Sequence, residues 1–230
     1  AELRSERPEA AAVSGAFPSI RIDTQGLFNP NLNYKLYMIP ALMVMLLTLI
    51  CGFLPALNVV GEKEAGTIEQ INVTPVSRFT FTLSKLLPYW LIGFIVLNLC
   101  MLLAWAVYGL TPVGSIFTIY LATLIFVLVM SGLGLVISNY SSTMQQAMFV
   151  MWFCMLIFIL MSGLFTPISS MPDWAQYITY INPLRYFMEM MRMVYLKGSG
   201  IGDIVQQLCV LSCFATILYG WAIHSYRKQQ

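Results

Sequence analysis

The distribution of charge along the chain constrains its fold more than any other feature. Three long stretches contain no Asp, Glu, Lys or Arg: Leu36–Gly61, Leu86–Pro172 and Ile204–Tyr226. A membrane-spanning helix needs about 20 apolar residues. As a single helix, the middle stretch would be roughly 130 Å long, because each residue adds about 1.5 Å. The middle stretch must therefore fold back on itself, most simply as three spans joined by two turns.

Composition and turn residues support an all-α integral membrane protein with five transmembrane helices. Hydrophobic residues make up 59% of the 230 residues and charged residues 10%, against about 25% charged in a soluble domain. This composition excludes a soluble enzyme, a disordered chain and a nucleic-acid binder. Two polar clusters, residues 109–115 and 138–146, mark the turns. The predicted spans are about 37–60, 86–109, 116–138, 145–165 and 203–225.

An odd number of spans places the two ends of the chain on opposite sides of the membrane. Positive residues are slightly more numerous on the side of residues 62–85, which favours that side as cytoplasmic. Residues 1–35 then form an extracytoplasmic tail, although the chain shows no signal peptide. Two explanations remain open. In the first, an earlier span and an extracytoplasmic domain are missing from the sequence, and the tail is the end of that domain. In the second, the first helix carries a short tail across the membrane.

The first long hydrophilic connection, residues 62–85, is here called the connector. Thr67 and Gln70 have the spacing of a capping box, in which two side chains satisfy backbone N–H groups at a helix start. Thr74 followed by Pro75 is a second helix start, with proline at the first helical position. The connector is thus predicted as a short helix, a break and a helix that enters the next span. It could lie on the membrane, dock into a partner, or be a solvated loop with ordinary caps.

The second long connection, residues 166–203, contains a pattern of two helices. The first has an apolar face, and Asn182 with Pro183 starts the second, which carries Arg185, Glu189 and Arg192 at helical pairing distances. We expect these three charges to act as one unit. This second helix is too apolar for a free surface helix and too charged for a clean span. We interpret the region as a helical hairpin that re-enters the membrane from outside, with a flat surface helix as the alternative.

Two stretches of this sequence resemble one known family. GEKEAGTIEQINVTPVSRFTFTLSKLLPYW is similar to the connector of type-2 ATP-binding-cassette (ABC) exporter permeases, and GLFTPISSMPDWAQYITYINPLRYFMEMMRMVYLKGSG is similar to their extracellular re-entrant segment. Their order and separation also agree, and the resemblance covers about residues 28–227. Members of the family usually have six spans with a large extracytoplasmic domain after the first, so this chain resembles the last five.

The resemblance implies a permease subunit of an ATP-driven exporter, multi-pass in a bacterial inner membrane. The apolar interior, in a chain with 15 Met and 14 Phe, favours a hydrophobic or amphiphilic substrate that is moved out of the cytoplasm. The partners that the resemblance implies would be a separate ABC ATPase, a second permease subunit in a homodimer or paralogous heterodimer, and membrane lipid. ATP and Mg would bind to the ATPase, and this chain itself would bind no cofactor. The connector would meet the ATPase through Glu62, Glu64, Gly66, Thr67, Glu69 and Gln70, with Thr74 and Pro75 as the elbow.

Other function classes have weaker support in the sequence. The chain has no phosphate-binding loop, no hydrolase motif and no metal-ligand cluster, so we expect no catalytic site in it. An ion-coupled secondary transporter is one alternative, but such carriers normally have carboxylates within their spans. The only carboxylate expected near membrane depth is Glu189. A membrane scaffold without transport is the other alternative, and co-purification with an ATPase would separate the exporter from both.

Overall fold

A computed structural model describes residues 34–66 and 78–226. Helices are the only regular elements in these two ranges. In chain order they are α1 (Tyr34–Thr48), the π-helix η1 (Leu49–Phe53), α2 (Leu54–Glu64), α4 (Arg78–Tyr108), α5 (Ile116–Tyr140), α6 (Met144–Leu160), the 3₁₀-helix η2 (Ile168–Ser170), α7 (Asp173–Thr179), α8 (Pro183–Lys197) and α9 (Ile201–Tyr226).

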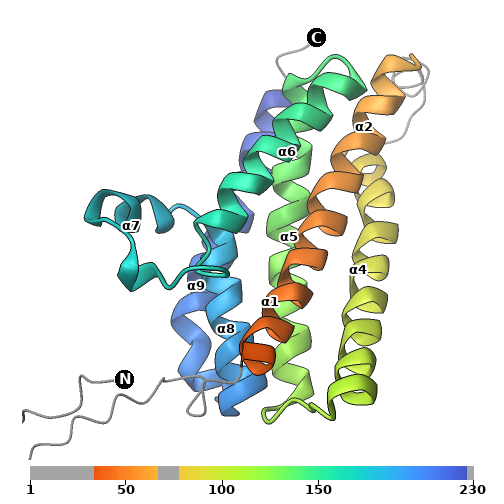
Figure 1. The fold of residues 1–230 in the computed structure, drawn as a ribbon. Helices are drawn as coiled ribbons and strands as arrows, with labels where there is room; N and C mark the ends of the chain where they lie inside the picture. Colours follow the sequence, from red (N-terminus) through yellow and green to blue (C-terminus); the bar gives the residue numbers. More distant parts are fainter. Residues whose placement is uncertain (1–33, 67–77, 227–230) are drawn as a thin grey trace, which may run out of the picture.

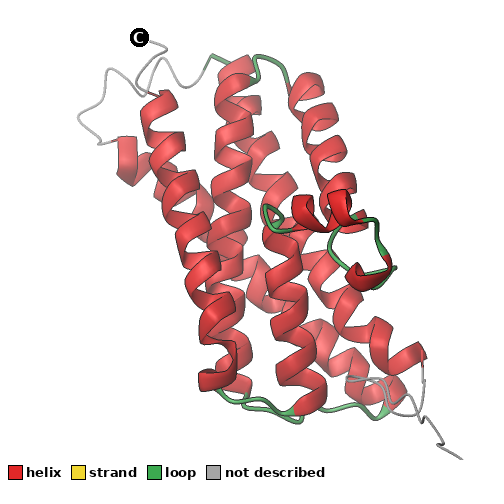
Figure 2. Cartoon of the chain, turned by 90° about the vertical axis from the view of Figure 1, so that its left-hand side faces the viewer, coloured by secondary structure: helices red, strands yellow, loops and turns green. Residues whose placement is uncertain are grey.

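The long helices run side by side along one axis (Figures 1 and 2). α1, η1 and α2 form one continuous rod, α4 runs back, and α5 returns. The bundle end where α2 stops, α4 starts and α5 turns into α6 is called the connector end below. The other end, where α1 starts, is called the opposite end. α5 lies at the centre and contacts every other long helix and α8.

Four helices are long and apolar enough to cross a membrane: Tyr37–Glu64, Leu83–Tyr108, Ile116–Tyr140 and Ile201–Ser225. They begin and end within about four residues of the predicted spans, which is the usual uncertainty of helix ends. The remaining predicted span corresponds to α6, an apolar helix of 17 residues that ends at Leu160. The chain is therefore an all-α integral membrane protein.

The path after α6 differs from a simple span. Gly163 has a φ of +79°, a conformation that glycine adopts without strain, and the chain turns sideways there into η2 and α7. α7 projects from the bundle at mid-height (Figure 1). α8 then continues to the opposite end, where Gly114 N–H donates to the Val194 carbonyl over 3.0 Å. Together, α6 and α8 thus lead the chain from the connector end of the bundle to the opposite end, with η2 and α7 between them.

The π-helix η1 interrupts the first rod where the rod packs against α5. Pro55, in the first turn of α2, has no N–H, so the regular i→i−4 bond to the Cys51 carbonyl cannot form. Such a local loss of helical bonding is a usual reason for a wider turn or a bend. A Cβ on Gly134 of α5 would lie 2.7 Å from the Gly52 carbonyl oxygen. Glycine at residue 134 is therefore what permits this backbone contact.

Candidate coupling site

The last turn of α2 carries three consecutive charged residues, and each contacts a different helix. Glu62 forms an ion pair with Lys85 of α4. Lys63 Nζ donates to the carbonyl oxygens of Ser138, at 2.6 Å, and Asn139, at 3.1 Å, near the end of α5. Glu64 Oε2 accepts from the Met144 N–H at the start of α6, at 2.9 Å. The triplet Glu62–Lys63–Glu64 thus joins α2 to three neighbouring helices at the connector end.

The signs of these charges match the helix ends that they contact. The last carbonyl groups of a helix have no partner within it and carry a partial negative charge, whereas the first N–H groups carry a partial positive charge. Lys63 is a cation at the end of α5, and Glu64 is an anion at the start of α6. Each contact therefore satisfies a backbone group and also has favourable electrostatics.

α9 is tied to the same region through α5. Asn139 accepts from Lys63 through its carbonyl oxygen, and its side-chain Nδ2 donates to the Ala222 carbonyl of α9 over 2.8 Å. The Asn139 side chain is buried. The hydrogen bonds that begin at Lys63 therefore continue across α5 to α9.

The triplet is the start of the connector, and the chain leaves α2 directly after it. The Ala65 N–H donates to the Gly61 carbonyl over 3.0 Å and the Gly66 N–H to the Lys63 carbonyl over 3.1 Å. Gly66 has a φ of +71° and ends the helix. Thr67, Glu69, Gln70, Thr74 and Pro75 lie outside the described residues, so their predicted contacts with an ATPase, and the coupling helix itself, stay predictions.

The structure gives Glu62 and Glu64 contacts that the sequence did not indicate. Both were expected to meet an ATPase, whereas here they contact α4 and α6 of their own chain. Lys63 and Lys85 were not among the predicted site residues. A lysine in the last turn of a helix was the available signal for Lys63, but the sequence does not identify which neighbouring helix end it contacts.

The predicted start of α8 has the expected cap. Asn182 Oδ1 accepts from the Leu184 N–H over 3.0 Å, and Pro183 occupies the first turn. Asn182 also donates through Nδ2 to the Phe158 carbonyl of α6 over 2.7 Å. The same side chain therefore caps α8 and fixes it against α6.

Arg192 is buried and holds the turn after α6. Its guanidinium donates to the carbonyl oxygens of Gly163 (3.1 Å) and Leu164 (3.4 Å) and lies 3.8 Å from the Tyr37 ring centroid. The Tyr37 hydroxyl donates to the same Gly163 carbonyl over 3.2 Å. Arg192 therefore connects the start of the first rod to the end of α6.

The prediction that Arg185, Glu189 and Arg192 act as one unit is wrong. No ion pair joins these residues in the described part of the chain. Arg192 turns to carbonyl groups that have no helical donor, Arg185 contacts the Thr179 hydroxyl and the Tyr180 ring, and Glu189 is exposed. Buried backbone acceptors need a donor, and this need outweighs a weak pair along one helix.

The surface-helix alternative for residues 183–197 is also wrong. α8 packs against α1, α5 and α9, and Phe187 and Tyr195 are among the largest fully buried side chains. The rings of Phe187 and Phe126 stack at a centroid distance of 4.0 Å. A helix that lies flat in lipid head groups would not bury these rings within protein. Entry of this segment from outside the cell remains a prediction.

The fold and this site together define a multi-pass membrane protein whose first rod is connected to the other helices at one end. In the described ranges, no group of His, Cys, Asp or Glu could hold a metal ion.

Comparison with known proteins then gives the family. The pattern of the family described as "ABC-2 family transporter protein" matches residues 5–223. The chain is 33% identical over 178 residues to the probable multidrug ABC transporter permease YbhR of Escherichia coli K12, which covers 77% of this chain and 48% of YbhR. It is 32% identical over 183 residues to the probable multidrug ABC transporter permease YbhS, covering 79% of this chain and 48% of YbhS.

A third relative matches over more of the chain. The inner membrane transport permease YhhJ of the same organism is 24% identical over 212 residues, which is 92% of this chain and 57% of YhhJ. This chain thus spans about half the length of the relatives that it matches. It belongs to the ABC-2 transporter family.

Proposed function

We propose that this chain is the membrane-spanning part of an ATP-driven ABC exporter that moves hydrophobic or amphiphilic compounds out of the cytoplasm. The ATPase is a separate chain, which holds ATP and Mg and docks at the connector. A second permease subunit completes the transport path, and the assembly lies in the bacterial inner membrane. Family membership and the names of YbhR, YbhS and YhhJ support this proposal.

One observation carries the mechanism: the triplet Glu62–Lys63–Glu64, at the start of the connector, contacts α4, α5 and α6. A displacement of the connector by the ATPase would act first on the end of α2. Because three neighbouring helices are tied to that end, they would move with it. The predicted contact residues Thr67, Glu69, Gln70, Thr74 and Pro75 would form the ATPase side of this linkage, and Glu62 and Glu64 the permease side.

Co-purification tests the proposal. The full-length permease is expressed with a tag together with the ABC ATPase encoded nearest to it, and the complex is isolated in mild detergent. We expect the ATPase to be retained and its ATP hydrolysis to be stimulated by amphiphilic compounds. A permease that retains no ATPase, with both proteins folded, would contradict the proposal and favour the scaffold or the ion-coupled carrier.

The proposed orientation has a separate test. In a cysteine-free background, Ala65→Cys at the connector end and Gly200→Cys at the opposite end each place a thiol at an exposed residue. An impermeant thiol reagent added to spheroplasts should label the second variant and not the first. Labelling of the first variant alone would reverse the orientation.

A further inference from the structure

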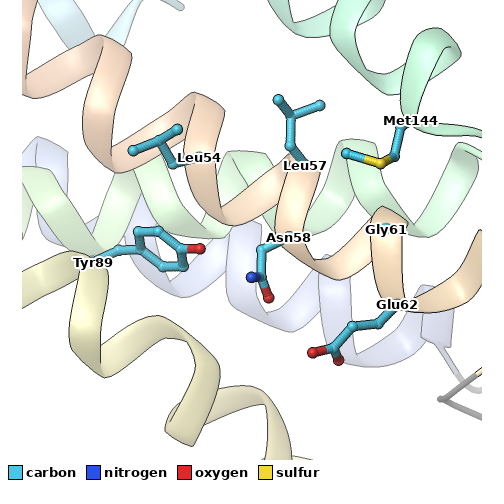
Figure 3. Close-up of a pocket in the computed structure, with 7 residues that line it drawn as sticks. All are labelled: Leu54, Leu57, Asn58, Gly61, Glu62, Tyr89 and Met144. Carbon is cyan, nitrogen blue, oxygen red and sulfur yellow. The ribbon is translucent and has the colours of Figure 1, made fainter. Parts of the chain in front are cut away.

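A cavity of about 390 Å³ opens at the side of α2, between α4 and the start of α6. Its volume lies within the usual range for small-molecule sites. Leu54 and Leu57 of α2 and Met144 of α6 supply apolar walls. Asn58 and Glu62 of α2 and Tyr89 of α4 supply polar groups, and the Asn58 amide lies between the other two (Figure 3). The cavity is therefore amphipathic.

Asn58 Oδ1 is an unsatisfied acceptor in this cavity. The atom is buried and has no hydrogen-bond partner among the residues that the structure describes. A buried polar atom without a partner is costly, and more so within a membrane, where lipid tails supply no donor. A ligand that donates a hydrogen bond would remove this cost.

The charges of the cavity restrict the ligand further. Glu62 already forms an ion pair with Lys85, so the carboxylate does not by itself leave a full negative charge to be neutralised. The Asn58 amide oxygen is neutral. What the site lacks is therefore a hydrogen-bond donor and not simply a positive charge. This requirement separates a primary ammonium, which has N–H groups, from a trimethylammonium, which has none.

The order of residues along α2 also matches an amphiphile. Glu62 lies near the helix end, Asn58 one turn further in, and Leu54 another turn further, with about 6 Å between successive levels. A head group at Asn58 would thus lie near the interface, and its chain would follow Leu57 and Leu54 toward the bilayer centre. Polar groups near the helix end and apolar groups deeper are the order that a lipid-like molecule needs.

We infer that this cavity binds the head group of an amphiphile through a hydrogen bond donated to Asn58 Oδ1, which a primary ammonium can supply and a trimethylammonium cannot, with the apolar chain against Leu54 and Leu57. The ligand is either a membrane lipid with a primary ammonium or a transported amphiphilic amine. This inference deepens the proposed function by naming a head-group chemistry, but lipid binding itself does not require the ATPase. The two proposals can therefore fail separately.

The lipid arm uses the full-length permease in nanodiscs of equal parts dioleoyl phosphatidylethanolamine and dioleoyl phosphatidylcholine. Native mass spectrometry counts the lipids retained after release from the disc. We expect phosphatidylethanolamine to be enriched about fivefold, the selectivity of one added hydrogen bond. Asn58→Leu should lose the enrichment, whereas Asn58→Asp, which keeps an acceptor, should retain it.

The amine arm measures binding of dodecylamine and of dodecyltrimethylammonium to the same variants. A preference for dodecylamine that Asn58→Leu abolishes would assign the site to a soluble amphiphilic amine. Asn98→Leu is the matched control, because Asn98 lies within α4 but donates to the Phe94 carbonyl and accepts from Tyr120. It should leave both preferences unchanged.

The inference is supported if either experiment shows a preference in the wild type that Asn58→Leu loses and Asn98→Leu keeps. The experiment that shows this preference identifies the source of the ligand. Removal of an unsatisfied acceptor should not unfold the protein, and unchanged thermal stability of Asn58→Leu is the check. The inference is overturned if neither arm shows a preference in the wild type, or if Asn58→Leu keeps the preference.

Discussion

Lys63 Nζ lies 2.6 Å from the carbonyl oxygen of Ser138, a residue 75 positions further along the chain. The bond joins the end of the first membrane rod to the end of the central helix α5. Its two neighbours in sequence make equivalent contacts with α4 and α6. A short charged sequence at the start of the connector is therefore the point where four helices meet.

The Glu62–Lys85 pair gives a prediction in which charge exchange should restore function. Glu62→Lys or Lys85→Glu alone places like charges beside each other, and we expect transport to fall several-fold. The double exchange should recover most of it. The Lys85 side chain is 36% exposed, so each change should alter stability by under about 1 kcal/mol. Transport into inside-out vesicles is the measurement, and failure of the double exchange to exceed either single variant would contradict a paired role.

Arg192 and Glu189 should differ sharply in their effect on stability. Arg192→Met leaves the Gly163 and Leu164 carbonyls without this donor, which should cost about 1–3 kcal/mol. Glu189→Ala changes an exposed side chain and should stay within about 0.5 kcal/mol of wild type. Thermal unfolding of the detergent-purified protein compares the two. Equal shifts in Tm would restore the interpretation that the charges of α8 act as one unit.

Gly134 should tolerate no side chain, because its Cβ would approach the Gly52 carbonyl oxygen of η1 to 2.7 Å. Gly134→Ala should therefore lower stability by about 1–3 kcal/mol through overpacking. Gly220→Ala in α9 is the matched control, because its Cβ would meet nothing within 4 Å. It should be neutral or stabilising by up to about 1 kcal/mol. If both variants unfold at the same temperature, the close contact of η1 with α5 is not tight in solution.

The sequence predicted the four long apolar helices, because lipid imposes a simple requirement on their length. A helix needs about 20 apolar residues to cross the bilayer. Stretches of at least this length without charged residues therefore mark such helices in the sequence. The Asn182–Pro183 start of α8 was also predictable, because a cap and a first-turn proline are local signals. Local chemistry was sufficient for both features.

Contacts between distant helices could not be predicted in the same way. Arg192 lies within pairing distance of Glu189 along the helix, yet it turns to carbonyl groups 28 and 29 positions earlier. These acceptors lie beyond the end of α6 at Leu160, where the chain turns sideways at Gly163. Likewise, the inward contacts of Glu62 and Glu64 depend on which helix starts and ends lie beside α2. Such partners follow from the packing of the bundle and not from spacing along the sequence.

The most direct test of the central claim is the amount of substrate transported for each ATP hydrolysed by a Lys63→Met variant. The full-length permease and its ATPase are reconstituted in proteoliposomes, and transport of a fluorescent amphiphile and phosphate release are measured in the same sample. Lys197→Met, which removes an exposed lysine from the last turn of α8 at the opposite end, is the control. We predict that Lys63→Met keeps most of the ATP hydrolysis but loses about tenfold or more of the transport for each ATP, while Lys197→Met equals the wild type. An unchanged ratio in Lys63→Met would contradict the claim that the end of α2 couples the connector to the other helices.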